Sequence, residues 1–322
     1  MHPALRIAAA IACALTSCAA HAQANFPARP VSIVVPYTQG VSVDNIARIL
    51  AARFNERWKQ PVVVENKPGA SGIIGTEFVA RATPDGYVLL FTVNTFAMAP
   101  ALFKKLPFDP LADFAPVGRV AVSSYALAVN AQLPARDFAE FLSLVKAKPG
   151  QLNYGTPGSG TPHHLAMELM KQREGLAIVH VPYKGAAGAI TDLLGGQVQM
   201  MFAPVPTLLP HARSGKVRFL AVTGERAPQA PDVPAFRELG MEYMDAVDSW
   251  FALLAPGKTP QALVQRLNQD LHAVMDSPDA REVLFKQGLR PSLSSPEELG
   301  AQIRSDLARW AKVVADGKIS AD

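Results

Sequence analysis

Short β-branched runs alternate with amphipathic stretches in the first hundred residues, and this alternation restricts the fold more than any other feature. Residues 31–35 (VSIVV) have the composition of a buried parallel strand, which Pro36 ends. The stretch that follows has apolar residues at helical spacing as far as Phe54, with Ser42 or Asp44 as a candidate cap. Further elements are expected as strands at 61–64 and 87–93 and a helix at 71–82. This βαβαβ order predicts an α/β fold with a mostly parallel sheet, flanked by helices on both faces.

The middle of the chain shows the same alternation of strands and helices. Helices are expected at 138–147, 164–172 and 187–194, and strands at 152–154, 178–181, 198–202 and 219–222. One more strand at 249–254 precedes three helices, which begin after Thr259, Ser277 and Ser295, the last forming a capping box with Glu298.

That C-terminal part is too small for a third domain, so we expect it to complete the first lobe. The predicted lobes are 23–125 plus 249–322 and 126–248. The two resulting crossings, near 125–129 and 247–251, would form a hinge over a cleft, which suits the enclosure of a ligand.

The N-terminus predicts export. Arg6 precedes an uncharged apolar run at 7–15, and Ala20-His21-Ala22 has the small-x-small pattern of a cleavage site, so residues 1–22 read as a signal peptide. A membrane anchor is the minor alternative, because the run is about half the length that spans a bilayer. Lipidation at Cys18 of the tetrapeptide LTSC is the second alternative. The expected location is the periplasm, and a chain starting at Gln23 has no cysteine.

Composition and motifs disfavour several other functions. Without Arg6 the chain has 30 basic and 27 acidic residues, a net charge of +3, too balanced and too scattered for nucleic-acid binding. The segment 158–160 (GSG) lacks the wider spacing of a nucleophile elbow, and 69–75 lacks the GK[ST] of a phosphate loop. His163 and His164 would point about 100° apart on a helix and share a metal poorly. We therefore expect no enzyme, no metal and no cofactor.

Polar and small residues follow the predicted strands, where open α/β sheets place their binding crevice. Several of these loops open directly into helices, whose N-terminal N–H groups suit an anion such as a carboxylate. Taken singly, each loop is more simply a turn or a cap, so the prediction depends on their shared position. The candidate ligand-binding residues are Tyr37, Thr38, Gln39, Ser42, Asp44, Ser71, Gly72, Asn94, Thr95, Thr156, Gly158, Ser159, Gly160, Thr161, His164, Tyr183, Ala203 and Pro204.

The same loops resemble a known family. The matching segments are FPARP at 26–30, VVVENKPGA at 62–70, PDGY at 84–87, LPFDP at 106–110, DFAPV at 113–117, GTPHHL at 160–165, VPYKG at 181–185, LAVT at 220–223 and LAP at 254–256. In this order they resemble the Bug family, the extracytoplasmic solute receptors of tripartite tricarboxylate transporters. The resemblance covers about 26–318.

The resemblance implies a two-lobed, type II-like periplasmic binding protein fold that closes on a small carboxylate, held largely by backbone amides and ordered water. It implies a membrane permease or a sensor kinase as partner, and we expect a monomer. Two positions depart from the family: Val41 replaces the second glycine of the first loop, and Ala203 replaces a common aspartate. Losing that aspartate favours a plain, apolar or aromatic carboxylate over an amino acid. The alternatives are a sensing or interaction protein of the same fold and, less favoured, a secreted enzyme.

Overall fold

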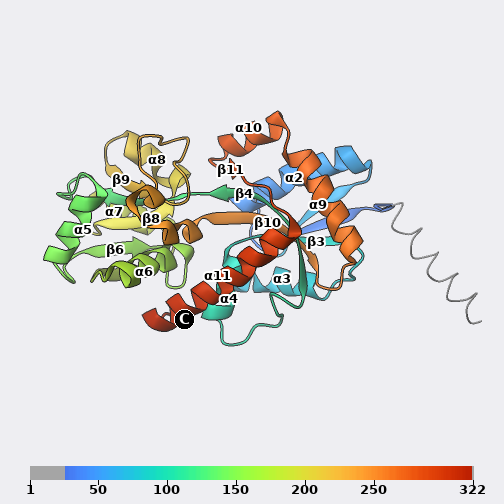
Figure 1. The fold of residues 1–322 in the computed structure, drawn as a ribbon, viewed down its shortest axis with the longest axis horizontal. Helices are drawn as coiled ribbons and strands as arrows, with labels where there is room; N and C mark the ends of the chain where they lie inside the picture. The colour runs from blue at the N-terminus through green and yellow to red at the C-terminus, as the bar shows by residue number, and fades with distance from the viewer. Residues whose placement is uncertain (1–25, 321–322) are drawn as a thin grey trace, which may run out of the picture.

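The computed structural model describes residues 26–320, which form a two-lobed α/β protein built on two mixed sheets (Figure 1). The expected signal peptide and Cys18 lie outside the described residues. Each sheet is sandwiched between helices, as the alternation of strands and helices predicts.

The first sheet has the strand order β11-β4-β10-β3-β1-β2. Strand β1 pairs in parallel with both β2 and β3, which confirms the predicted βαβαβ unit. Strand β10 returns from late in the chain and pairs antiparallel with β3 and β4, so the sheet is mixed. The strands are β1 (Val31–Val35), β2 (Val62–Asn66), β3 (Val88–Val93), β4 (Phe114–Ser123), β10 (Ser249–Pro256) and β11 (Arg290–Pro291).

Two groups of helices cover this sheet (Figure 1). One face packs against α2 (Ser42–Trp58), α9 (Gln261–Met275) and α10 (Pro278–Lys286). The other packs against α3 (Ile73–Ala80), α4 (Thr95–Leu102) and the first half of α11 (Pro296–Gly317), with the short η1 (Ala70–Gly72) before α3.

The second sheet has the order β7-β6-β8-β5-β9 and is built in the same way. Strands β6, β7 and β8 run parallel, whereas β5 lies antiparallel between β8 and β9. The strands are β5 (Tyr125–Asn130), β6 (Asn153–Thr156), β7 (Val179–Pro182), β8 (Met200–Pro204) and β9 (Val217–Val222). Around them lie α5 (Phe138–Ala147), α6 (Pro162–Glu174), α7 (Ala186–Gly195), α8 (Val205–Arg213), η2 (Phe236–Leu239) and η3 (Glu242–Val247).

The helix starts show which capping predictions hold. Ser277 caps α10, and Ser295 forms the expected capping box with Glu298. Thr259 does not cap α9, because that helix begins one residue later, after Pro260, and the Thr259 hydroxyl donates to the Pro256 carbonyl instead.

At α2 the prediction is also wrong. Val41 occupies the N-cap, and neither Ser42 nor Asp44 supplies a capping hydrogen bond. Helices α4 and α8 were not expected, since Pro100 and Pro210 lie inside them and obscure the helical pattern.

The chain passes between the sheets at Ser124 and again between Val222 and Ser249. Thr223 joins both passages: the Tyr125 N–H donates to the Thr223 hydroxyl at 2.8 Å, and that hydroxyl donates to the Asp248 carboxylate. Arg290 of β11 contacts the other oxygen of Asp248 at 3.1 Å. The hinge is therefore a buried polar cluster rather than a pair of loose linkers.

Helix α11 is a third connection, which sequence patterns did not indicate. Its first half packs on the first sheet through Leu299 and Ile303, while Trp310 and Val313 lie in the core of the second lobe. The Gln172 side chain of α6 donates to the Val313 carbonyl at 3.0 Å. Figure 1 shows α11 running diagonally from one lobe to the other, so this helix packs on both lobes.

We predict that Thr223→Val destabilises the protein by about 1–3 kcal/mol, because the isosteric change leaves the buried Asp248 oxygen and the Tyr125 N–H without their partner. Urea unfolding measures the difference. Thr191→Val on the exposed face of α7 is the matched control, and we expect it to stay within about 0.5 kcal/mol of the parent. Equal effects for the two variants would show that the hinge cluster contributes nothing specific.

Candidate ligand-binding site

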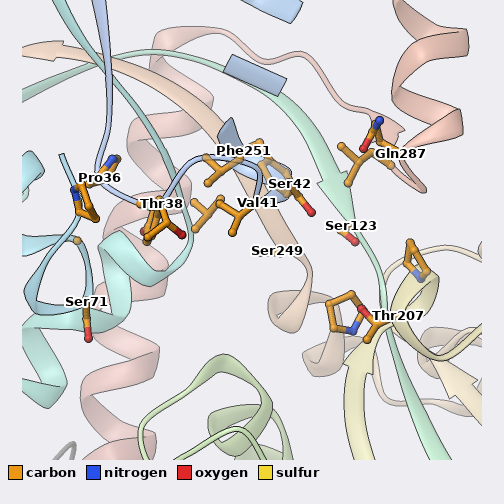
Figure 2. Close-up of a pocket in the computed structure, with 18 of the residues that line it drawn as sticks. Pro36, Thr38, Val41, Ser42, Ser71, Ser123, Thr207, Ser249, Phe251 and Gln287 are labelled. Carbon is orange, nitrogen blue, oxygen red and sulfur yellow. The ribbon is translucent and has the colours of Figure 1, made fainter. Parts of the chain in front are cut away.

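A cavity of about 480 Å³ lies where the two sheets meet, and Figure 2 shows the side chains around it. Its first-lobe wall comes from the loops after β1 and β2, together with the strand ends at the hinge. Its second-lobe wall comes from the start of α8, and the turn between α10 and β11 closes the far end. The lining residues are Pro36, Tyr37, Thr38, Val41, Ser42, Val43, Pro68, Gly69, Ser71, Gly72, Val93, Ser123, Pro204, Pro206, Thr207, Ser249, Phe251, Gln287 and Leu289.

Close backbone packing fixes the two first-lobe loops. A Cβ added at Gly75 would lie 2.6 Å from the Lys67 carbonyl and 2.9 Å from Pro36, so only glycine lets α3 approach both loops. Gly40 has φ +87°, a conformation that suits glycine. Val41 has φ −77° and ψ 162°, ordinary extended values, so its side chain is accommodated without strain.

The second-lobe wall touches the first lobe directly. A Cβ at Gly288 would lie 2.0 Å from Cγ of Pro206, which places the α10–β11 turn against the start of α8. Ser123 and Ser249 face the cavity from the hinge, where β4 and β10 are paired at these two residues.

Three helices begin at the cavity without a side-chain cap. They are α2 after Val41, α3 after Gly72 and α8 after Pro204. Helices α5, α6, α10 and α11 carry a capping side chain, whereas α4, α7 and α9 also lack one but do not begin on the lining of this cavity. No side chain caps the three helices at the cavity, and each helix adds positive potential at its N-terminus. The first backbone N–H of α8 (Val205) donates to the Ser124 carbonyl at 3.0 Å, and that of α3 (Ile73) donates to the Ala70 carbonyl, so α2 has the most open of the three starts.

Asp44 lies beside this site but turns away from it. Its carboxylate accepts hydrogen bonds from the Gly40 N–H, Arg48 and Asn66 at 2.8–3.0 Å, and its side chain is 1% exposed. Burial opposes its ionisation, but the hydrogen bonds from Arg48, Gly40 and Asn66 outweigh burial and hold the pKa of Asp44 below its ordinary value. Asp44 thus positions the loop after β1 rather than lining the cavity.

A second cavity of about 270 Å³ continues on the other side of Tyr37 and Ser71, which line both spaces. It lies between α4 and the loop before α6, with Thr95, Ser159, Gly160 and Thr161 on its wall. The Tyr37 hydroxyl is hydrogen-bonded to the Thr95 hydroxyl at 2.5 Å, which holds the ring between the two cavities.

The structure brings together part of the predicted set. Tyr37, Thr38, Ser42, Ser71, Gly72 and Pro204 line the first cavity, and Tyr37, Ser71, Thr95, Ser159, Gly160 and Thr161 line the second. Lining neither are Gln39, Asp44, Asn94, Thr156, Gly158, His164, Tyr183 and Ala203.

Physical reasons place several of these residues elsewhere. Strand β8 extends to Pro204, two residues beyond the predicted end, so Ala203 is a buried strand residue in the apolar core of the second lobe. Asn94 is 1% exposed and accepts from Ser249. The Tyr183 hydroxyl donates to Asp192 at 2.5 Å.

Sequence reasoning missed other lining residues, among them Ser123, Thr207, Ser249, Phe251, Gln287 and Leu289. They come from antiparallel strands, from the first turn of α8 beyond the predicted loop after β8, and from the α10–β11 turn, which follows no strand of the parallel units. The helices expected after Thr259, Ser277 and Ser295 predicted a compact C-terminal unit. They did not predict that the α10–β11 turn of this unit would line the cavity.

Histidines support the loop before α6. The rings of His164 and His180 stack at 3.8 Å, His164 Nδ1 accepts from the Gly160 N–H, and His180 is hydrogen-bonded to the Thr156 hydroxyl at 2.7 Å. Burial, with a smaller contribution from the neighbouring His164, lowers the pKa of His180 to about 4. Both rings thus act as neutral hydrogen-bonding groups that hold the loop in place.

Within residues 26–320, no group of three or more His, Cys, Asp or Glu side chains is placed to hold a metal ion. Over the same residues no helix is long and apolar enough to cross a membrane. A cleft between two hinged α/β lobes, with loops and helix N-termini converging on it, is the architecture of a solute-binding protein.

Comparison with known proteins gives the family. Residues 46–318 match the model of the tripartite tricarboxylate transporter family receptor. The Bordetella pertussis protein BugT is 36% identical over 295 residues, covering 90% of each chain.

Solved structures agree. The periplasmic binding protein BugD is 34% identical to this chain, with a TM-score of 0.71. The match covers 92% of this chain and 99% of BugD. An R. palustris protein solved with adipate is 33% identical, with a TM-score of 0.74 and the same coverage. The chain therefore belongs to the tripartite tricarboxylate transporter receptor family, as its motifs indicate, and is a solute-binding receptor rather than an enzyme.

We predict that His163 makes the protein acid-sensitive. Its ring lies against Tyr125, and burial lowers its pKa from 6.5 to about 4. Below pH 6.5 the unfolded chain binds a proton that the folded protein does not, so stability falls as pH drops from about 6.5 to about 4, by up to roughly 3 kcal/mol.

Thermal unfolding at pH 7, 5.5 and 4 tests this prediction. His163→Phe removes the titrating ring, and its melting temperature should fall less between pH 7 and pH 4 than that of the parent. Parallel pH profiles for the two proteins would contradict it.

Proposed function

We propose that this receptor captures a small carboxylate in the cavity between its lobes and delivers it to the membrane subunits of a tripartite tricarboxylate-type transporter. The observation that carries the proposal is the convergence of three uncapped helix N-termini on a cavity that no charged side chain lines. Free N–H groups and helix dipoles attract an anion without a fixed counter-charge.

A planar carboxylate suits these donors better than a bulkier anion would. Its two oxygens can accept from the first turn of α2 and from Thr207 in the first turn of the opposite helix α8, so that one ligand joins the two lobes. The hydroxyls of Ser42 and Thr207 stand at those two helix starts and supply further donors (Figure 2). The adipate bound by the R. palustris relative is a carboxylate too, which supports this ligand class.

Closure of the lobes is part of the proposal. We take their boundaries to be those expected from the sequence, 23–125 plus 249–322 and 126–248. Closing would rotate the lobes about the polar cluster of Tyr125, Thr223 and Asp248, with α11 sliding on α6. Binding both walls favours the closed form, because the ligand's contacts are complete only there.

The expected location is the periplasm, where BugD acts as a binding protein by its description. A sensing role without transport is the second candidate, with a sensor kinase in place of the permease. The family's definition by a transporter favours the first. Uptake of a labelled acid by cells with and without this receptor separates the two functions.

We predict that Ser42→Asp weakens carboxylate binding at least tenfold. The new carboxylate would lie at the first position of α2, where it occupies the free N–H groups and repels an anionic ligand. The same change should leave the melting temperature of the free protein unchanged or slightly raised, since an acid at a helix start is favourable by about 0.3–1 kcal/mol.

Isothermal titration with a panel of acids measures the effect, and Ser143→Asp on the exposed face of α5 is the matched control. The panel holds aliphatic mono- and dicarboxylates, citrate, benzoate and amino acids. Binding of an acid that is equally tight in the parent and in Ser42→Asp would rule out the α2 terminus as the anion site. Failure of every acid to bind the folded parent would rule out the function itself.

A further inference from the structure

The cavity lacks any partner for a second charge on the ligand. None of its lining residues is acidic or basic. The nearest cations are already paired: Arg48 contacts Asp44, Lys67 contacts Glu65, and Arg290 contacts both Glu225 and Asp248. A second carboxylate or an ammonium group would therefore lose its hydration without gaining a counter-charge.

The walls beyond the helix starts are apolar. Val43, Val93, Phe251 and Leu289 line the cavity together with prolines of both lobes. Burial of hydrocarbon against such walls is favourable in proportion to the area removed from water. The cavity is thus polar at the three helix starts and apolar in its body.

Val41 is where these two surfaces meet. It is the N-cap residue of α2, it lines the cavity, and it is 41% exposed. Figure 2 shows it beside Ser42 and Phe251. Its isopropyl group places hydrocarbon next to the start of α2, beside the anion site.

We propose that Val41 is a specificity-determining residue that makes this receptor select monocarboxylates with an apolar body over dicarboxylates and amino acids. The inference rests on the proposed function, because it takes the three helix starts as the carboxylate site. The ligand's charged end lies at the helix starts, and its hydrocarbon part packs against Val41, Phe251 and Leu289.

Titration of the purified protein with cyclohexanecarboxylate, benzoate, succinate and adipate tests the proposal. We expect either monocarboxylate to bind at least about tenfold more tightly than either dicarboxylate. Val41→Thr keeps the β-branched shape and exchanges one methyl for a hydroxyl, and it should weaken monocarboxylate binding by about tenfold while leaving dicarboxylate binding nearly unchanged. Val63→Thr, on the exposed face of edge strand β2, is the control and should change neither.

The outcomes separate this inference from the proposed function. Succinate or adipate binding as tightly as the monocarboxylates, with a selectivity ratio that Val41→Thr leaves unaltered, would overturn the inference while the receptor function stands. No binding of any of the four acids by the folded parent would overturn the inference, and the receptor function falls too if citrate and the amino acids also fail to bind. Val41→Thr and Val63→Thr have the same change in chemistry, so equal effects on affinity would also overturn the role of Val41.

Discussion

The hydroxyl of Thr223 links the two passages of the chain between the lobes, and the two-lobed architecture depends on this link. It accepts from the Tyr125 N–H at the first passage between the sheets and donates to Asp248 at the second. Burial raises the pKa of Asp248 to about 6, while Thr223 and Arg290 favour its charged form. This cluster fixes the ends of β4 and β10, and hence the positions of Ser123 and Ser249 on the cavity wall. In this cluster the buried Asp248 carboxylate is paired with both Thr223 and Arg290.

The cavity follows from that hinge and from backbone geometry rather than from charged side chains. Three helices of two lobes begin there without a capping side chain, and glycines at 40 and 75 allow the loops to reach it. Anion attraction supplied by helix starts needs no counter-charge, so the remaining walls are free to be apolar. Receptors that share this backbone can then bind different ligands because of single side chains on the cavity wall. In this receptor Val41 is the proposed example.

Much of the fold could be predicted because hydrophobic periodicity and strand–helix alternation are local signals. The strand at 31–35 and the helix at 138–147 have the predicted bounds, and the family follows from the motifs. The site was harder, because its geometry is not local. Position after a parallel strand identifies Tyr37, Ser42 and Ser71, but the contributions of Thr207, Gln287 and Leu289 arise from how α8 and the α10–β11 turn meet. Ala203 was wrongly predicted to be in the site. Strand β8 extends two residues beyond its predicted end, which places Ala203 in the apolar core of the second lobe.

A crystal structure of the protein with benzoate tests the central claim most directly, because it locates the carboxylate without assuming an affinity. The account predicts both carboxylate oxygens within hydrogen-bond distance of first-turn N–H groups of α2 and α8, and the ring against Val41 and Phe251. A carboxylate held by an arginine or lysine, or bound away from the helix starts, would contradict it.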